Sequence, residues 1–158
     1  MIQAFQTLPA SGHLPGADAM APSENERHWA ASAHLSALVL AMLTSWVAGG
    51  AGVAGAGVVY AIKHQESAFV ADHAREAINF NLSMFIYACA AVVIAIALVG
   101  ATVLTLGLGL ILTIPAGIAL AFAGAGIAVM WLVCSIIATI KAWNGEHYRY
   151  PLTLRLLR

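Results

Sequence analysis

The feature that most constrains this sequence is a run of 64 residues, from Ala77 to Ile140, without a single Asp, Glu, Lys or Arg. A second uncharged run covers 35 residues, from His28 to Ile62. A helix needs about 20 apolar residues to cross a bilayer, so the two runs hold at least three crossings. Only 9% of the chain is charged, against about 25% in ordinary globular proteins. These observations predict an all-α membrane protein.

The first apolar run is too long for one crossing. A single helix over residues 28–62 would be about 52 Å long, whereas the hydrocarbon core of a bilayer is about 30 Å thick. Gly49, Gly50 and Gly52 favour a tight turn, so we predict a helical hairpin. Its second leg, about residues 52–62, is short for a full crossing. It is a thin span, a re-entrant segment or a helix that runs on past Lys63.

The start of the first helix carries recognisable signals. Ser23 and Glu26 have the spacing of a capping box. Trp29 and Trp46 bracket the helix about 25 Å apart, as expected of a span anchored at both interfaces. Residues 1–22 are rich in Pro, Gly, Ala and Ser and are predicted to be a disordered tail. The membrane domain then covers residues 23–158.

The second hairpin occupies the longer uncharged run. Its first helix is expected over about residues 69–99, because a glycine-rich segment follows. Its second helix is expected over about residues 115–143, with a helix stop at Gly145. Pro151 disfavours a helical conformation at Tyr150, so the chain should leave the membrane as an extended segment.

The distribution of positive charge predicts the orientation. In this arrangement all seven Lys and Arg residues lie on one face, and such a bias marks the cytoplasmic side. We therefore predict a multi-pass, four-helix polytopic bundle of two helical hairpins in the cytoplasmic (inner) membrane, with both termini cytoplasmic. The rival arrangement has three spans and an outside N-terminus, which leaves Arg27 alone on the wrong side.

Polar residues at the cytoplasmic mouth of the bundle form the candidate site. Ionisable groups within spans usually face the bundle interior, which applies to His34. Helix neighbours three residues apart can touch, which pairs Asp72 with Arg75 and His73 with Glu76. This pattern is either an interfacial helix start that stays in reach of water or a partner-docking site. The cluster comprises His34, Asp72, His73, Arg75, Glu76 and Asn79, and Tyr148, Arg149, Tyr150 and Pro151 are expected to pack against it.

Small residues at helical spacing lie on both returning helices. They let helix backbones approach closely, either within the chain or between copies of it. These residues are Gly52, Ala56, Gly117, Ala121 and Ala125. Cys89 and Cys134 lie inside apolar runs, which favours small core residues over a disulfide or a metal pair.

The sequence offers no pattern for enzyme chemistry. It has no glycine-rich phosphate loop, no nucleophile elbow and no metal-ligand spacing, so we expect no enzyme, no cofactor and no metal site. Zero net charge, without a basic run interleaved with aromatic residues, argues against nucleic acid as a partner. The expected partners are the lipid bilayer and either further copies of this chain or a membrane complex.

A family resemblance rests on three segments: ENERHWAASAHLSAL, SAFVADHAREAINFNLSMFIY and IIATIKAWNGEHYRYPLTLRLLR. They resemble the bacterial Tic-twenty-like family, a domain of unknown function related to a subunit of the chloroplast inner-envelope import translocon, over residues 23–158. The segment GAGVAGAG departs from the family's Gly-Pro pair, and the loop between the last two helices is longer. The resemblance implies a four-helix membrane protein of unsettled role, and the plastid relatives suggest a channel or a translocon partner.

We therefore predict a non-enzymatic structural or partner-binding subunit, or a small channel-forming oligomer, of a bacterial inner membrane. The alternative is an ion-coupled or proton-linked small transporter in which His34 binds or relays the ion. Replacing His34 with Ala should abolish a flux in the second case and only weaken assembly in the first.

Overall fold

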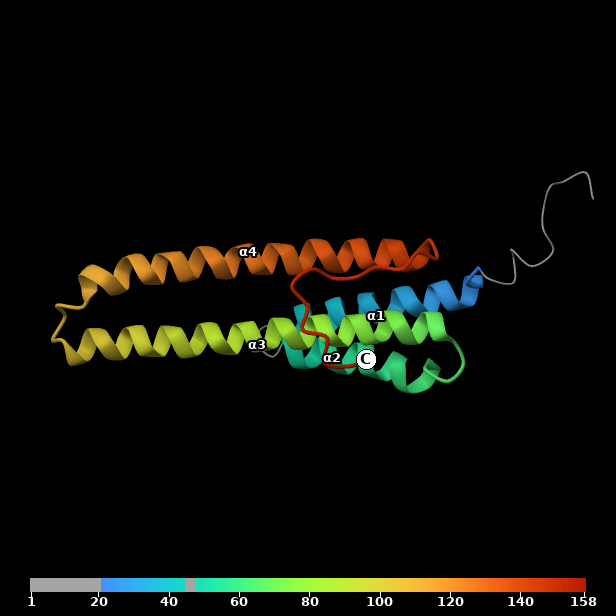
Figure 1. Ribbon diagram of the computed structural model, residues 1–158, viewed down its shortest axis with the longest axis horizontal. Coiled ribbons are helices and arrows are strands. Elements are labelled where there is room, and N and C mark those ends of the chain that lie inside the picture. The colour runs from blue at the N-terminus through green and yellow to red at the C-terminus, as the bar shows by residue number, and fades with distance from the viewer. Residues whose placement is uncertain (1–20, 45–47) are drawn as a thin grey trace, which may run out of the picture.

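The computed structural model describes residues 21–44 and 48–158, which form four α-helices and, within those ranges, no β-strand (Figure 1). The helices are α1 (Glu24–Leu43), α2 (Ala48–Lys63), α3 (Ala68–Leu104) and α4 (Leu110–Trp143). The predicted all-helical fold is confirmed for these residues. The predicted interface anchor Trp46 and residues 1–20 of the predicted tail lie outside the described residues.

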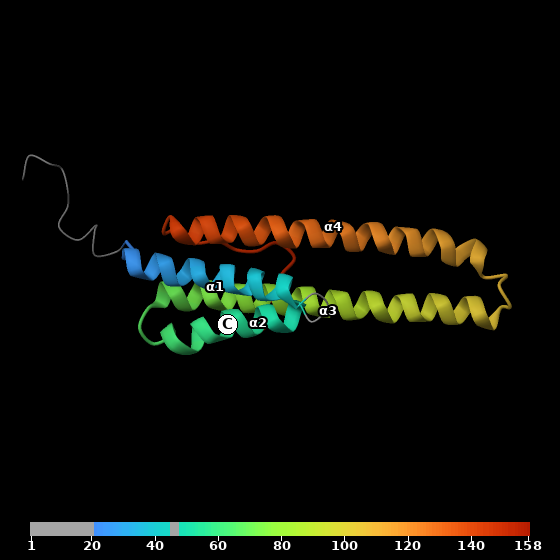
Figure 2. The same ribbon diagram turned by 180° about the vertical axis from the view of Figure 1, so that it is seen from behind.

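The four helices form two hairpins of unequal length. Helices α1 and α2 have 20 and 16 residues, whereas α3 and α4 have 37 and 34. Both short helices lie beside the first half of α3, and the last part of α4 packs against α1 (Figures 1 and 2). The short helices and the adjoining parts of α3 and α4 are called here the proximal bundle. Beyond it, residues 85–131 continue as an apolar hairpin.

The apolar hairpin has the length of a membrane crossing. Residues 85–104 of α3 rise about 30 Å at 1.5 Å per residue, which is the thickness of the hydrocarbon core. Most of its large apolar side chains are exposed, including Ile111 (80%) and Phe122 (75%). Among the described residues, α3 and α4 are the two helices long and apolar enough to cross a membrane.

Local sequence signals place some helix ends correctly. Ser23 and Glu26 form the predicted capping box, in which the Ser23 Oγ accepts from the Glu26 amide and the Glu26 carboxylate accepts from the Ser23 amide. Helix α4 ends at Trp143, and Gly145 follows with a φ of 78°. That left-handed conformation strains other residues and suits glycine, so the predicted stop is confirmed.

Three predicted boundaries are wrong because glycine did not end the helix. Gly49, Gly50 and Gly52 lie inside α2, not in a turn before it. Helix α3 continues through Gly100 to Leu104, and α4 begins at Leu110, before Pro115. An apolar environment offers the backbone no other hydrogen-bond partner, which favours helix even through glycine.

The interior of the proximal bundle is built from small side chains. A β-carbon at Gly52 would lie 2.7 Å from Cγ of Asn81 on α3, and one at Gly55 would lie 3.0 Å from the Ser36 backbone of α1. Ala56 is completely buried in the same interface. By contrast, Gly117, Ala121 and Ala125 do not pack tightly on another helix, and the first two line a cavity of about 500 Å³ between α3 and α4.

Candidate functional site

The polar cluster lies inside the proximal bundle, under the segment that follows α4. The first turns of α3 supply Asp72, His73, Arg75, Glu76 and Asn79, and α1 supplies His34. Four of these residues are no more than 2% exposed: His34, His73, Glu76 and Asn79. Buried polar groups are costly without hydrogen-bond partners. The partners here come mainly from the C-terminal segment, defined as residues 144–158.

A chain of hydrogen bonds connects three buried rings. The hydroxyl of Tyr150 lies 2.9 Å from Nδ1 of His34, and Nε2 of His34 lies 2.9 Å from Nδ1 of His73. Each imidazole nitrogen is a donor or an acceptor according to its tautomer. In either direction the chain ends at Nε2 of His73, which has no hydrogen-bond partner among the described residues. The ring of His73 is stacked on that of the exposed His147, with centroids 5.8 Å apart.

The carboxylate of Glu76 organises a group of charges around it. Nη1 of Arg149 donates to its Oε1 at 2.5 Å, and the backbone amide of Tyr150 donates to its Oε2 at 3.4 Å. Arg155 donates to Oε1 at 3.4 Å. The hydrogen bond that Arg149 donates to Glu76 and the nearby charge of Asp72 raise the pKa of Arg149, so this arginine stays protonated. The buried carboxylate therefore faces two cations from the C-terminal segment.

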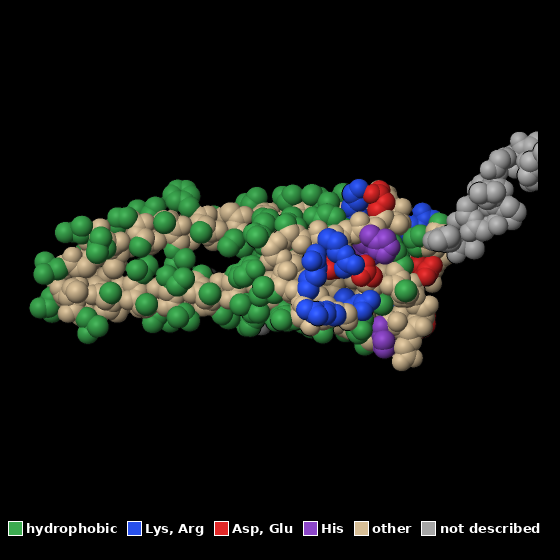
Figure 3. Space-filling view, viewed as in Figure 1, with side chains coloured by type: hydrophobic (Ala, Val, Ile, Leu, Met, Phe, Trp, Pro, Cys, Tyr) green, Lys and Arg blue, Asp and Glu red, His purple; other side chains and the backbone are tan. Residues whose placement is uncertain are grey.

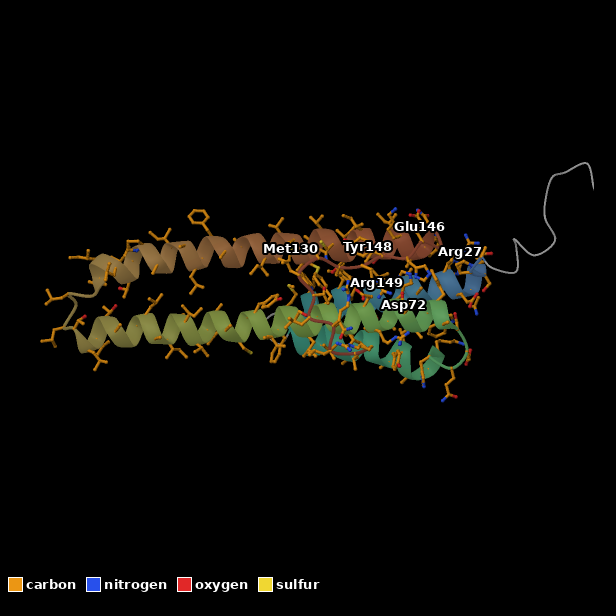
Figure 4. All side chains as sticks on the ribbon, viewed as in Figure 1. Arg27, Asp72, Met130, Glu146, Tyr148 and Arg149 are labelled. Atoms are coloured by element: carbon orange, nitrogen blue, oxygen red, sulfur yellow. The ribbon has the colours of Figure 1, made fainter. Side chains whose placement is uncertain are left out.

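Asp72 joins the same group from the surface. It accepts from Nη2 of Arg149 at 3.0 Å, and its second oxygen lies 3.2 Å from Nδ1 of His147. Figure 4 shows Asp72 of α3 beside Arg149. The predicted helix pair of Asp72 and Arg75 is not formed, because the guanidinium of Arg75 donates to the backbone oxygen of Ala71.

The side chain of Asn79 holds the backbone of the C-terminal segment. Its Oδ1 accepts from the amides of Leu156 at 3.1 Å and Leu157 at 2.8 Å, and its Nδ2 donates to the oxygen of Leu157 at 2.9 Å. One turn later the hydroxyl of Ser83 accepts from the amide of Leu154 at 2.8 Å. These side chains replace the strand or helix partners that an irregular backbone lacks.

Aromatic packing fixes the first part of the C-terminal segment. The ring of Tyr150 is stacked on Phe80, with centroids 3.9 Å apart, and Tyr148 meets it edge-on. Burial raises the pKa of Tyr148 to about 12 and also raises that of Tyr150, so both hydroxyls stay protonated near neutral pH. Pro151 is exposed at the bend where the segment turns back across α3 (Figure 1).

The structure thus connects His34, His73, Glu76 and Asp72 in one network through Tyr150 and Arg149. Asn79 lies nearby and holds the backbone of residues 156 and 157. Arg75 lies at the edge of this network. Among residues 21–44 and 48–158, no carboxylate lies within salt-bridge distance of its guanidinium. Sequence reasoning missed His147, Arg155 and Ser83. Arg155 lies directly between Leu154 and Leu156, and nothing in this local sequence indicates that its partner Glu76 lies on α3.

Within the part of the chain that the structure describes, no group of three or more His, Cys, Asp or Glu residues is placed to hold a metal ion. Cys89 is exposed on the apolar hairpin, whereas Cys134 is buried beside the Phe80 and Tyr150 cluster.

Comparison with known proteins identifies a family. A family described as the magnetosome magnetite crystal formation protein family matches residues 25–157. No curated protein and no solved structure matches the chain. The Tic-twenty-like assignment made from the sequence segments is therefore wrong, since the match over almost the whole described chain is to a different family.

Proposed function

The chain belongs to the magnetosome magnetite crystal formation protein family, and from this membership we propose that it is a non-enzymatic membrane protein that acts in the formation of magnetite crystals. Its membrane is then the magnetosome membrane, in place of the general inner membrane predicted from the sequence. The observation that carries the non-enzymatic role is the use of the buried polar groups: Glu76, Asn79 and His34 each hold part of this chain's own C-terminal segment.

The arrangement in the membrane is part of this proposal. The apolar hairpin crosses the bilayer, and the proximal bundle lies at one face with both termini on that side. All seven Lys and Arg residues lie outside residues 77–140, which makes that side cytoplasmic. Helices α1 and α2 lie beside only the first half of α3 (Figure 2), so they lie at the near face of the bilayer and do not cross it with the hairpin. This replaces the four-span arrangement expected from the sequence.

The turn between α3 and α4, at the far end of the hairpin, is apolar. The turn between α3 and α4 presents Leu106 (95% exposed) and Leu108 (80% exposed), with Thr105 before them. Iron ions are bound in proteins by carboxylate, imidazole and thiolate side chains, and the turn at residues 105–109 carries none of them. We therefore place the protein's action at the proximal bundle, as a subunit that organises other membrane components.

Labelling from the two sides of sealed vesicles tests the arrangement. Cysteines are introduced singly at Ser23, Thr44 and Thr105 in a background with Cys89 and Cys134 replaced by serine. A membrane-impermeant maleimide should reach positions 23 and 105 from opposite sides, and position 44 should not be reached from the side of position 105. Equal labelling of 44 and 105 from one side would restore the four-span arrangement.

The role itself is tested in a magnetosome-forming host that lacks the gene. Size and shape of the crystals are measured by electron microscopy with the wild type or with Glu76→Gln restored. A structural role predicts that crystal defects follow the loss of folded protein. Normal folding and abundance of Glu76→Gln with complete loss of crystal control would favour chemistry at Glu76 and refute the proposal.

An ion-coupled transporter is the second candidate, because a hydrogen-bonded chain runs from Tyr150 through His34 to an open nitrogen on His73. Reconstituted protein should then show a proton or cation flux that His34→Ala abolishes.

The native mass after gentle solubilisation distinguishes a complex subunit from a self-assembled oligomer. Foreign chains in fixed ratio indicate a complex subunit, and a pure oligomer of this chain indicates self-assembly.

A further inference from the structure

The C-terminal segment presents leucines and arginines to the outside at the base of the apolar hairpin. Leu152, Leu154, Leu156 and Leu157 are 66%, 42%, 58% and 43% exposed. Arg155 and Arg158 alternate with them and are exposed as well. Four exposed leucines in six residues are unusual for a surface in contact with water, whereas leucine beside arginine is typical of segments at a membrane interface.

The hydrogen bonds of this segment fix its depth. The oxygen of Leu152 accepts from the Tyr87 hydroxyl at 2.8 Å, and the amide of Leu154 donates to Ser83. Leu157 lies at Asn79, two turns nearer the start of α3. Leu152 therefore lies where the apolar hairpin begins, and Leu157, next to Arg158, lies about 12 Å further out along α3. This is the order of acyl chains and head groups in one leaflet.

Aromatic residues mark the same level. Tyr87 lies at the base of the hairpin on α3, and Trp131 lies there on α4, where its indole donates to Asn81 at 3.3 Å. Tyrosine and tryptophan concentrate at the boundary between lipid and water. An irregular backbone reaches this depth only when its polar groups have partners, and the side chains of Asn79, Ser83 and Tyr87 supply several of them.

The arginines give the surface its charge. Figure 3 shows Lys and Arg side chains grouped beside the hydrophobic surface of the hairpin. Arg149 and Arg155 contact Glu76 of α3. Arg75 lies one turn before Asn79 on α3, and Arg158 follows Leu157, whose amide is bound by Asn79. Asp72 and Glu76 offset Arg149 and Arg155. Within residues 21–44 and 48–158, neither Arg75 nor Arg158 has a carboxylate at salt-bridge distance, so two positive charges remain for an external anion.

We propose that Arg75 and the segment Leu152–Arg158 form an interfacial surface that binds an anionic phospholipid, with Arg75 and Arg158 at its phosphate and Leu152 and Leu154 among its upper acyl chains. Guanidinium groups match phosphate oxygens in geometry and charge. The proposal rests on the membrane crossing of the apolar hairpin proposed above. The surface gives the protein a lipid preference that the uncharged hairpin alone lacks.

Native mass spectrometry of the full chain in detergent, mixed with equal amounts of phosphatidylglycerol and phosphatidylcholine, tests this. The wild type should retain phosphatidylglycerol several-fold more than phosphatidylcholine. Arg75→Gln with Arg158→Gln should retain both equally. The control, Arg27→Gln with Lys141→Gln, removes the same charge from elsewhere on the proximal bundle and should keep the preference.

Equal retention of the two lipids by the wild type would overturn the proposal, and so would an equal loss in both double variants. If the Arg75 and Arg158 variant does not fold, the wild type decides the matter at high salt. If the surface binds the lipid by charge, salt screening should abolish the preference for phosphatidylglycerol. A preference that persists at high salt would refute the proposal. If the wild type floats with vesicles but shows no lipid preference, the proposed membrane crossing stands and only the proposed lipid-binding surface is refuted.

Discussion

Two glycines of α2 should respond in opposite directions to the same substitution. Gly57→Ala adds a methyl group where no atom lies within 4 Å, whereas Gly52→Ala places one against Asn81 and 3.3 Å from the backbone oxygen of Ala37. Alanine is favoured over glycine in a helix interior by about 1 kcal/mol. Gly57→Ala should therefore raise the stability of the protein by roughly that amount.

The cost at position 52 follows from what Asn81 would have to give up. Its Nδ2 donates to the oxygen of Ala77 at 2.9 Å, and its Oδ1 accepts from the Trp131 indole at 3.3 Å. Moving this buried side chain forfeits both hydrogen bonds, at about 1 kcal/mol each, which agrees with the usual overpacking cost of about 1–3 kcal/mol. After the helix gain, Gly52→Ala should lose up to about 2 kcal/mol.

Thermal unfolding in a mild detergent, followed by circular dichroism, measures both variants against the wild type. For a chain of this size 1 kcal/mol corresponds to a Tm shift of about 2–4 °C. Gly52→Ala should melt below the wild type or level with it, and Gly57→Ala above it. The reasoning is refuted if Gly52→Ala melts as high as Gly57→Ala. As a further check, Gly52→Ala should become stabilising once Asn81 is replaced by alanine.

Three further predictions concern the C-terminal segment. Tyr150→Phe leaves Nδ1 of buried His34 without its partner and should cost about 1–3 kcal/mol, read as a lower Tm; an unchanged Tm would show that the hydrogen bond adds nothing. Asn79→Leu removes the acceptor and donor for Leu156 and Leu157, so amide exchange at residues 154–157 should accelerate by at least about tenfold while residues 24–43 keep their rates. The pKa values of Tyr148 and Tyr150 are raised in the folded state, so as pH rises the unfolded state loses these protons first. The free energy of unfolding should therefore be constant below about pH 10 and should decline between about pH 10 and 12. Tyr148→Phe should make that decline shallower in melting curves, and an identical decline would contradict the assignment to Tyr148.

Local signals in the sequence were sufficient for the helices and for two of their ends. The capping box at Ser23 and the left-handed Gly145 depend on neighbours within four residues, so the sequence contains all the information needed. The glycines near residue 50 misled the prediction, because their use is close contact between helices and not a turn. Only the packed structure distinguishes these two uses.

The candidate site was predictable as a set of residues but not as a set of contacts. Ionisable side chains at an apolar border stand out in a sequence, which is why His34, His73 and Glu76 were selected. Their partners depend on the rotation of α1 about α3 and on the path of an irregular segment. The pairing of Asp72 with Arg149, 77 residues away, is of this kind, whereas the local pair with Arg75 that spacing suggested did not form.

The dependence of Glu76, Asn79 and His34 on residues 149–157 also sets an order of events during synthesis. Residues 149–157 emerge after all four helices, so α1 to α3 assemble while a buried carboxylate, an amide and an imidazole still lack their final partners. Until the C-terminal segment docks, these groups must stay hydrated, and the proximal bundle cannot reach its final packing. Docking of the last residues thus completes the fold, and a chain interrupted before Arg149 would expose an open, charged interior at the membrane surface.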